Sequence, residues 1–237
     1  MTDSSQISRA SAVDDFRRAR RQVAMRDLIG RLTGQPTTLL SYEDVRQKLK
    51  GQLAGRRELR DVPVAAIVGS VGRYTDFTRD FLPRNDSDEN RWVGVRRAVE
   101  GSVGVPPIEL YQLGDAFFVL DGNHRVSVAR QTGASHIQAY VTEVRARVPF
   151  TPGDSPDDLI VKAEYTDFLE QTRLDELRPA SNLLVTAPGQ YADLFHQIDA
   201  HLAQLAEAGR AADLPAAAAD WYDSVYLPIV DEIRQQG

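Results

Sequence analysis

The stretch from Phe117 to Gly133, FFVLDGNHRVSVARQTG, decides the fold of the middle of this chain. Its opening apolar run is rich in β-prone residues and predicts a strand that ends at Leu120. A glycine follows at position 122, and the next residues predict a short helix that stops at Gly133. The strand therefore passes into the helix through Asp-Gly-Asn-His-Arg, an unusual density of polar groups for such a junction.

The start of this predicted helix has the features of a phosphate-binding site. The first N–H groups of a helix have no intrahelical partner, and the helix dipole places partial positive charge at the same end. Gly122 allows a phosphate to approach the backbone, and the planar guanidinium of Arg125 can grip two oxygens at once. The candidate phosphate-binding residues are Gly122, Asn123, His124 and Arg125, and the candidate catalytic groups are Asp121 and His124.

A purely structural interpretation explains the same residues equally well. Arg125 lies on one helical stripe with Val128, so its stem leans toward the core while its head stays near the helix start. A guanidinium held there can take Asp121 as an internal partner, and Asn123 or Asp121 can simply cap the helix. Spacing alone leaves both interpretations open.

The long polar loop over residues 69–84, GSVGRYTDFTRDFLPR, adds candidates to the same site. Its glycines make the backbone adaptable, and Arg73 brings positive charge that suits a phosphate. Asp76 and Asp80 are weak candidates for holding a magnesium ion or acting as a base. For any single residue of the loop, a solvated surface position is the favoured alternative.

The segments around the junction predict a small mixed sheet with packed helices, an α+β fold. Valine-rich residues 61–70 predict a strand, and residues 87–101 predict a helix capped by Ser87 with Trp92, Val95 and Val99 on one face. Two further strands meet at the hairpin signal Gly114-Asp115, and HIQAYVTEV at 136–144 predicts another strand.

Helical segments flank this central region on both sides. After a frayed tail over residues 1–13, residues 14–33 predict a helix with a basic face and with Phe16, Val23, Leu28 and Leu32 on its apolar face. A second helix is predicted over residues 41–53, and the chain after Pro152 is mainly helical. We expect an N-terminal tail and helices over 1–60, the α+β domain over 61–148 and a helical extension over 149–237.

Composition limits the classes of function. Hydrophobic residues make up 42% of the 237 residues and charged residues 26%, which are ordinary values for a folded protein. The net charge of −6 argues against a protein that mainly neutralises DNA phosphates. There are no cysteines, no apolar run of membrane-spanning length and no signal peptide, so we expect a soluble cytoplasmic protein without membrane association.

The run from Asp61 to Val144 resembles the ParB/sulfiredoxin-like superfamily, the fold of the N-terminal domain of ParB partition proteins. VPVAAI is similar to the first strand of that family, and RWVGVRRAVEGSVGVPPIELY to its helix and following strand. FFVLDGNHRVSVARQTGASHIQAYV is similar to its signature, with Gly122 and Arg125 at the Gly-x-x-Arg positions. The resemblance implies a compact α+β domain that binds nucleotide phosphates, with ATP or CTP and magnesium as candidate ligands.

Departures from the family narrow the expected activity. Asn123 stands where sulfiredoxins carry their reactive cysteine, which excludes reductase chemistry by that route. ParB proteins carry a second arginine where this chain has His124, and their later Glu-Asn-x-x-Arg motif and DNA-reading region have no counterpart after Val144. The free-serine kinases of this fold use a glutamate after the first strand, and AAIVGSVG contains none.

Three functions remain open. The favoured one is a nucleotide-binding protein, with NTP hydrolysis or phosphotransfer as its candidate reactions. The second is a DNA-associated, partition-like regulator whose basic helix over 14–33 contacts the DNA backbone. The third is a non-catalytic interaction module in which Trp221, Tyr222 and Tyr226 bind a partner or a second copy in a homodimer, although packing of these rings onto the protein's own core is the favoured interpretation.

Overall fold

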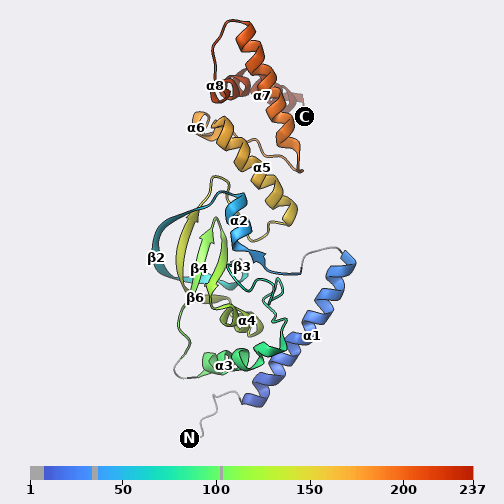
Figure 1. Cartoon of the computed structure of the whole chain (residues 1–237), viewed down its shortest axis with the longest axis vertical. Helices are drawn as coiled ribbons and strands as arrows, with labels where there is room; N and C mark the ends of the chain where they lie inside the picture. The colour runs from blue at the N-terminus through green and yellow to red at the C-terminus, as the bar shows by residue number, and fades with distance from the viewer. Residues whose placement is uncertain (1–7, 34–36, 102–103, 237) are drawn as a thin grey trace. The chain divides into compact units, whose positions relative to one another are not determined.

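A six-stranded mixed sheet organises the first of the two units into which the chain divides (Figure 1). The computed structural model describes residues 8–33, 37–101 and 104–236. The first unit comprises residues 1–47 and 51–153, and the second comprises residues 48–50 and 154–237. The described helix that precedes the sheet in sequence, Arg9–Thr33, therefore belongs to the same unit as the sheet itself.

The sheet has the strand order β1-β3-β5-β4-β6-β2. The neighbouring pairs β1/β3, β3/β5 and β4/β6 are parallel, whereas β5/β4 and β6/β2 are antiparallel. The predicted hairpin is confirmed as the β4/β5 pair, with Gly114 in the turn at φ 61°. The strands are β1 (Leu40–Ser41), β2 (Gln52–Pro63), β3 (Ile67–Ser70), β4 (Ile108–Leu113), β5 (Ala116–Asp121) and β6 (His136–Arg145).

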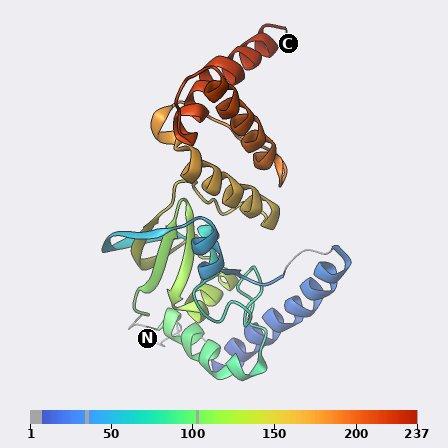
Figure 2. The ribbon, with the colours of Figure 1, turned by 45° about the horizontal axis from the view of Figure 1, so that its top comes forward.

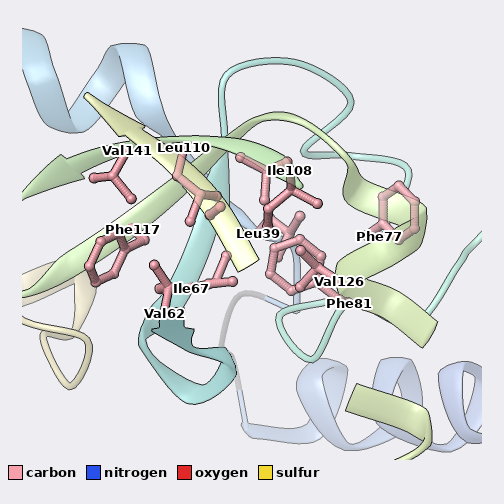
Figure 3. Packing of buried hydrophobic residues seen from close by; sticks show 12 residues of the cluster. Leu39, Val62, Ile67, Phe77, Phe81, Ile108, Leu110, Phe117, Val126 and Val141 are labelled. Carbon is pink, nitrogen blue, oxygen red and sulfur yellow. The ribbon is translucent and has the colours of Figure 1, made fainter. Parts of the chain in front are cut away.

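Alternate residues of the central strands build the main core on one face of the sheet (Figure 3). Side chains two apart in a strand point to the same face, which brings Ile108 and Leu110 of β4 beside Phe117 of β5 and Val141 of β6. Val126 of α4 closes this cluster from the helix layer. Each fully buried aliphatic side chain contributes about 1.5–3 kcal/mol, so this cluster fixes the position of α4 against the sheet.

In the first unit, α1 packs against α3, α3 packs against α4, and α4 packs against the sheet (Figures 1 and 2). Trp92 is fully buried where α1, α3 and α4 meet, and its indole N–H donates to Ser127 Oγ at 2.9 Å. This contact holds α3 beside the start of α4. The helices are α1 (Arg9–Thr33), α2 (Tyr42–Lys48), α3 (Glu89–Glu100) and α4 (Asn123–Gln131), with 3₁₀ turns at Val64–Ala66 and Asp86–Asp88.

The second unit is helical throughout its regular structure. Ser155 and Asp158 form a capping box at the start of α5, and a π-helical turn, Tyr222–Tyr226, precedes Pro228. Trp221 and Tyr222 are buried, and the half-buried ring of Tyr226 lies 5.5 and 5.4 Å from theirs, which confirms that the three rings pack internally. Its helices are α5 (Pro156–Thr172), α6 (Leu174–Leu177), α7 (Gln190–Glu207), α8 (Leu214–Trp221) and α9 (Leu227–Gln236). Among all described helices, none has the length and apolar character needed to cross a bilayer.

Several predicted elements differ from the observed ones. The strand predicted over 61–70 is two strands, because the chain turns through a 3₁₀ helix at Val64–Ala66. The second helix ends at Lys48 rather than continuing to residue 53, and β2 begins at Gln52 in a stretch with no predicted strand. Almost every residue of β2 is exposed, so this edge strand lacks the apolar alternation that reveals a strand in sequence.

The predicted N-terminal tail and the apolar face of the first helix also need correction. Residues 1–7 lie outside the described residues, whereas α1 already begins at Arg9. Phe16 and Val23 are buried as predicted, but Leu28 is 60% exposed and Leu32 is 79% exposed. The 12-residue α3 is about 18 Å long and the 25-residue α1 about 37 Å, so α3 covers only part of α1.

Two predictions about helix boundaries are wrong for local reasons. Ser87 lies inside the 3₁₀ turn, and the N-cap of α3 is Asp88. The single helix predicted over 155–177 is broken at Arg173, which adopts a left-handed conformation at φ 49°. The segment over residues 181–191, predicted as a strand or an extended piece, forms no strand and passes into α7.

Candidate functional site

A pocket of about 190 Å³ lies in the first unit, where the start of α4 faces α3 and the loop after β3. The polar junction singled out in the sequence forms one side of it, and Gly72 and Arg73 of the loop form another. The structure thus brings together all the predicted phosphate-binding residues. The lining residues are Gly72, Arg73, Arg91, Val95, Leu120, Asp121, Gly122, Asn123, His124 and Arg125.

Gly122 is the N-cap of α4 and has φ 117°, a backbone conformation that residues with a Cβ rarely adopt. A Cβ at this position would lie 2.5 Å from Ile108 Cγ2, so glycine also provides the space for the turn. No side chain caps the helix, and Val126 is the first residue whose N–H donates to the Gly122 carbonyl. The N–H groups of residues 123–125 have no partner among the described residues, which leaves an anion-attracting end beside the pocket.

Arg125 is occupied by internal acceptors. Its Nη1 donates to the carbonyls of Pro106 and Pro107 at 2.7 and 2.9 Å, and its Nη2 pairs with Asp121. Three of the five N–H groups of this guanidinium are therefore used within the unit. This is the internal pairing that the sequence left open, and it gives Arg125 the role of tying α4 to the segment before β4.

Arg73, another lining residue, also pairs with internal partners. Its Nε donates to Asp76 at 2.6 Å, its Nη2 to Asp88 at 2.8 Å, and its Nη1 lies 3.2 Å from His124 Nε2. The two carboxylates, first Asp88 and then Asp76, raise the pKa of Arg73 above its usual range. Arg73 itself has φ 57°, a left-handed conformation that costs about 1–3 kcal/mol and persists only where surrounding contacts impose it.

His124 is almost fully buried, with 5% of its surface exposed. Burial, opposed by Asp88 and reinforced by Arg73 and Arg91, lowers the pKa of His124 to about 4. The imidazole is therefore neutral at pH 7, and its Nδ1 has no hydrogen-bond partner among the described residues. Asn123 Oδ1 is a second buried atom without such a partner.

The predicted metal candidates belong to separate networks. Asp76 pairs with Arg73, whereas Asp80 pairs with Arg26 of α1 at 2.8 Å and lies 3.9 Å from Arg130 of α4. Within the described ranges, no three His, Cys, Asp or Glu side chains come together as a metal site. Asp121, a predicted catalytic group, keeps 63% of its side chain exposed while it pairs with Arg125.

Sequence reasoning missed Arg91 and Asp88, both at the start of α3. Arg91 lines the pocket, is exposed and has no hydrogen-bond or ion-pair partner among the described residues. It lies four residues before Val95, another lining residue, so both share one helical face. That spacing was visible in the sequence, but the position of α3 opposite α4 was not. Asp88 is a buried carboxylate whose Oδ2 also lacks a partner in the described structure.

Comparisons with known proteins give a limited result. No family model matches the chain, and no curated protein matches it. Among solved structures, sulfiredoxin from Arabidopsis thaliana is similar over 37% of this chain and 88% of its own, with 14% sequence identity and a TM-score of 0.29. Similarity at this level carries no conclusion about activity, so the site is judged on its own geometry.

Proposed function

We propose that this pocket binds a phosphate group and that the protein is a nucleotide-binding protein. The observation that carries the proposal is a set of hydrogen-bond donors without internal acceptors around one cavity. The N–H groups at the start of α4 and the guanidinium of Arg91 make up this set. An oxyanion supplies the acceptors that these groups lack, and its charge is favoured by the helix end and by the arginine.

The size of the cavity indicates which part of the ligand is enclosed. Pockets that enclose whole drug-sized ligands measure roughly 300–1,000 Å³. The cavity of about 190 Å³ therefore suits a phosphate or a short polyphosphate, with the remainder of the molecule outside. The resemblance to the ParB/sulfiredoxin-like superfamily supports a nucleoside triphosphate, with ATP and CTP as candidates. Because Asp76 and Asp80 are paired with arginines, magnesium would arrive on the phosphates of the ligand.

Binding has more support than turnover. A general base needs an available lone pair within reach of the attacking group. His124 Nε2 faces Arg73 at 3.2 Å, and the Asp121 carboxylate is paired with Arg125. Hydrolysis or phosphotransfer would first require Asp121 to leave Arg125, so the proposal is for phosphate binding.

Isothermal titration with inorganic phosphate, ATP and CTP, each with and without magnesium, tests the proposal. We expect at least one ligand to bind the native chain and Arg91→Gln to weaken its affinity about tenfold, because one charge-assisted contact is lost. Arg97→Gln is the matched control, since Arg97 is exposed on the same helix and does not line the pocket. No binding of any ligand, or equal weakening by the two variants, would overturn the proposal.

A further inference from the structure

We propose that the edge strand β2 pairs with β2 of a second copy of this chain, across a twofold axis at Leu59. β2 is the last strand in the order of the sheet, with β6 on its inner side (Figure 1). Its outer side makes no backbone hydrogen bond with any other described segment, so its N–H and C=O groups can pair with another strand. None of its residues lines the pocket, so this pairing does not depend on the proposed phosphate site.

The middle of β2 is exposed on both faces of the sheet. From Glu58 onward its register with β6 is continuous, so this part of the strand is regular. Because side chains alternate along a strand, Arg57, Leu59 and Asp61 lie on one face. Glu58 and Arg60 lie on the other. Leu59 is 54% exposed, an apolar side chain between charged neighbours that an antiparallel partner strand would cover.

The order of charges along this segment is complementary to its own reverse. With the axis at Leu59, Arg57 of one copy lies opposite Asp61 of the other, and Glu58 lies opposite Arg60. Each pair occurs twice, because a twofold axis exchanges the copies. The two residues of each pair share a face, and opposite charges at directly opposed positions stabilise paired strands. Leu59 meets its own counterpart on the axis.

The same charges disfavour every neighbouring register. A residue on the twofold axis is opposed by itself, and like charges at directly opposed positions are destabilising. An axis at Glu58 or Arg60 would therefore oppose two carboxylates or two guanidinium groups. Leu59 is the only uncharged residue from 57 to 61, so one register remains. Charged edges discourage pairing with most chains, whereas this order of charges matches a second copy.

On one face of the sheet, the pairing would complete a square of alternating charges. Glu58 and Arg60 already form a pair within each strand, at 2.7 Å, and Arg60 also donates to Gln112 at 2.8 Å. In the paired sheet each of the two charges gains a partner of opposite sign from the second copy. Like charges occupy only the diagonals, where positions are about 7–8 Å apart.

On the other face, Asp61 has no hydrogen-bond or ion-pair partner among the described residues. Arg57 pairs with Glu109 at 2.6 Å and lies over the ring of Tyr140. The Arg57 and Glu109 side chains are 52% and 37% exposed, and such surface pairs contribute little to stability. Turning the flexible Arg57 side chain toward Asp61 of the second copy therefore exchanges one exposed ion pair for another.

Sedimentation equilibrium of the full chain tests the pairing. We expect a monomer–dimer equilibrium with a dissociation constant of about 1–100 μM, since an edge contact is small. Arg60→Glu and Glu58→Arg should each weaken it at least about tenfold, because attractive pairs become repulsive. An equal mixture of these two variants should form a heterodimer, because each carries the charges that the other lacks. The double variant Glu58→Arg/Arg60→Glu should dimerise like the native chain.

The absence of cysteine from the chain allows the register to be tested separately. Leu59→Cys places its thiol on the axis, where opposed Cα atoms are about 4.5–5.5 Å apart, so mild oxidation should join two copies by a disulfide. Leu53→Cys is the matched control, since Leu53 is a leucine of the same strand that is 65% exposed. It lies six residues from the axis, so its thiols stay beyond the reach of a disulfide.

Three results would overturn the pairing. The first is a native chain that stays monomeric up to about 0.5 mM, well above the expected dissociation constant. The second is a dimer that Arg60→Glu and Glu58→Arg leave unchanged, or that their mixture fails to restore. The third is equal cross-linking of Leu59→Cys and Leu53→Cys. Phosphate binding by the Arg60→Glu chain should equal that of the native chain, so the two proposals succeed or fail independently.

Discussion

Gly122 is the residue on which the shape of the pocket depends most directly. Its φ of 117° turns the chain from β5 into α4, and the first N–H groups of the helix have no partner among the described residues. Ile108 packs so close to this turn that a Cβ would lie 2.5 Å from its Cγ2. Both the conformation and the contact therefore require glycine.

Gly122→Ala should destabilise the first unit by about 2–4 kcal/mol, because backbone strain and overpacking against Ile108 add together. Gly133→Ala is the matched control, since Gly133 also has a positive φ, of 72°, but a Cβ there meets nothing within 4 Å. We expect that control to lose only about 1 kcal/mol. Urea unfolding followed by fluorescence compares the two, and equal losses would show that Ile108 does not restrict position 122.

The residues of the site divide into those that sequence could reveal and those that it could not. Gly122, Asn123, His124 and Arg125 are consecutive, so their convergence on a helix start follows from local structure alone. Arg91 comes from another helix, and its position at the pocket depends on the packing of α3 beside α4. The pairing of Arg125 with Asp121 was one of the two interpretations that the sequence left open, whereas its acceptors at Pro106 and Pro107 come from a different segment and could not be foreseen.

At the scale of elements, α1 has its buried apolar residues in its first part, whereas polar contacts hold its later part, where Asp27 accepts hydrogen bonds from Thr37 and Arg84. Ala12, Phe16, Ala19 and Val23 form its buried stripe, and the ring of Phe16 lies 5.8 Å from that of Trp92. Its basic face is partly used inside the unit, since Arg20 pairs with Asp86 and Arg26 with Asp80. These internal pairs neutralise part of the positive charge with which α1 would contact DNA phosphates. The net charge of −6 for the whole chain also argues against the DNA-associated interpretation.

Phe16→Ala should cost about 3–5 kcal/mol of stability, because it removes a buried ring from the contact between α1 and α3. Leu28→Ala, on the exposed part of the same helix, should cost less than about 1 kcal/mol. Thermal and urea unfolding of both variants measure the difference. Similar losses would mean that the later part of α1 packs against the protein as closely as its first part does.

The elements themselves were predictable wherever their apolar pattern was strong. The β4/β5 hairpin, α4 and β6 follow directly from alternation, turn residues and a glycine stop. The edge strand β2 was missed because Arg56, Arg57, Glu58 and Arg60 give it charged residues on both faces. Such charges discourage pairing of an edge with other chains, but they also remove the pattern that identifies a strand.

At the scale of the whole molecule, the stability of the first unit is linked to the protonation of one buried side chain. The pKa of His124 is about 4 in the folded chain, below its ordinary value of 6.5. The unfolded chain therefore binds this proton more readily, so stability is full above about pH 6.5 and falls as the pH drops toward 4. Sequence alone placed His124 at the site, but its burial and its neighbours set its protonation.

We expect the free energy of unfolding of the first unit to fall by about 2 kcal/mol between pH 7 and pH 4.5 through His124 alone. In a Trp221→Phe background, the fluorescence of Trp92 reports on this unit within the full chain. His124→Gln should lack this part of the pH dependence. An identical pH slope in the presence and absence of His124 would show that the residue titrates normally.

The central claim is that the start of α4 holds a phosphate, and amide NMR on the full chain tests it most directly. On titration with inorganic phosphate, the amide signals of Asn123, His124 and Arg125 should shift together along one saturable curve. The same titration of Arg91→Gln should give a curve about ten times weaker, and that of Arg97→Gln should match the native chain. Amide signals of residues 123–125 that stay fixed at saturating phosphate would contradict the account.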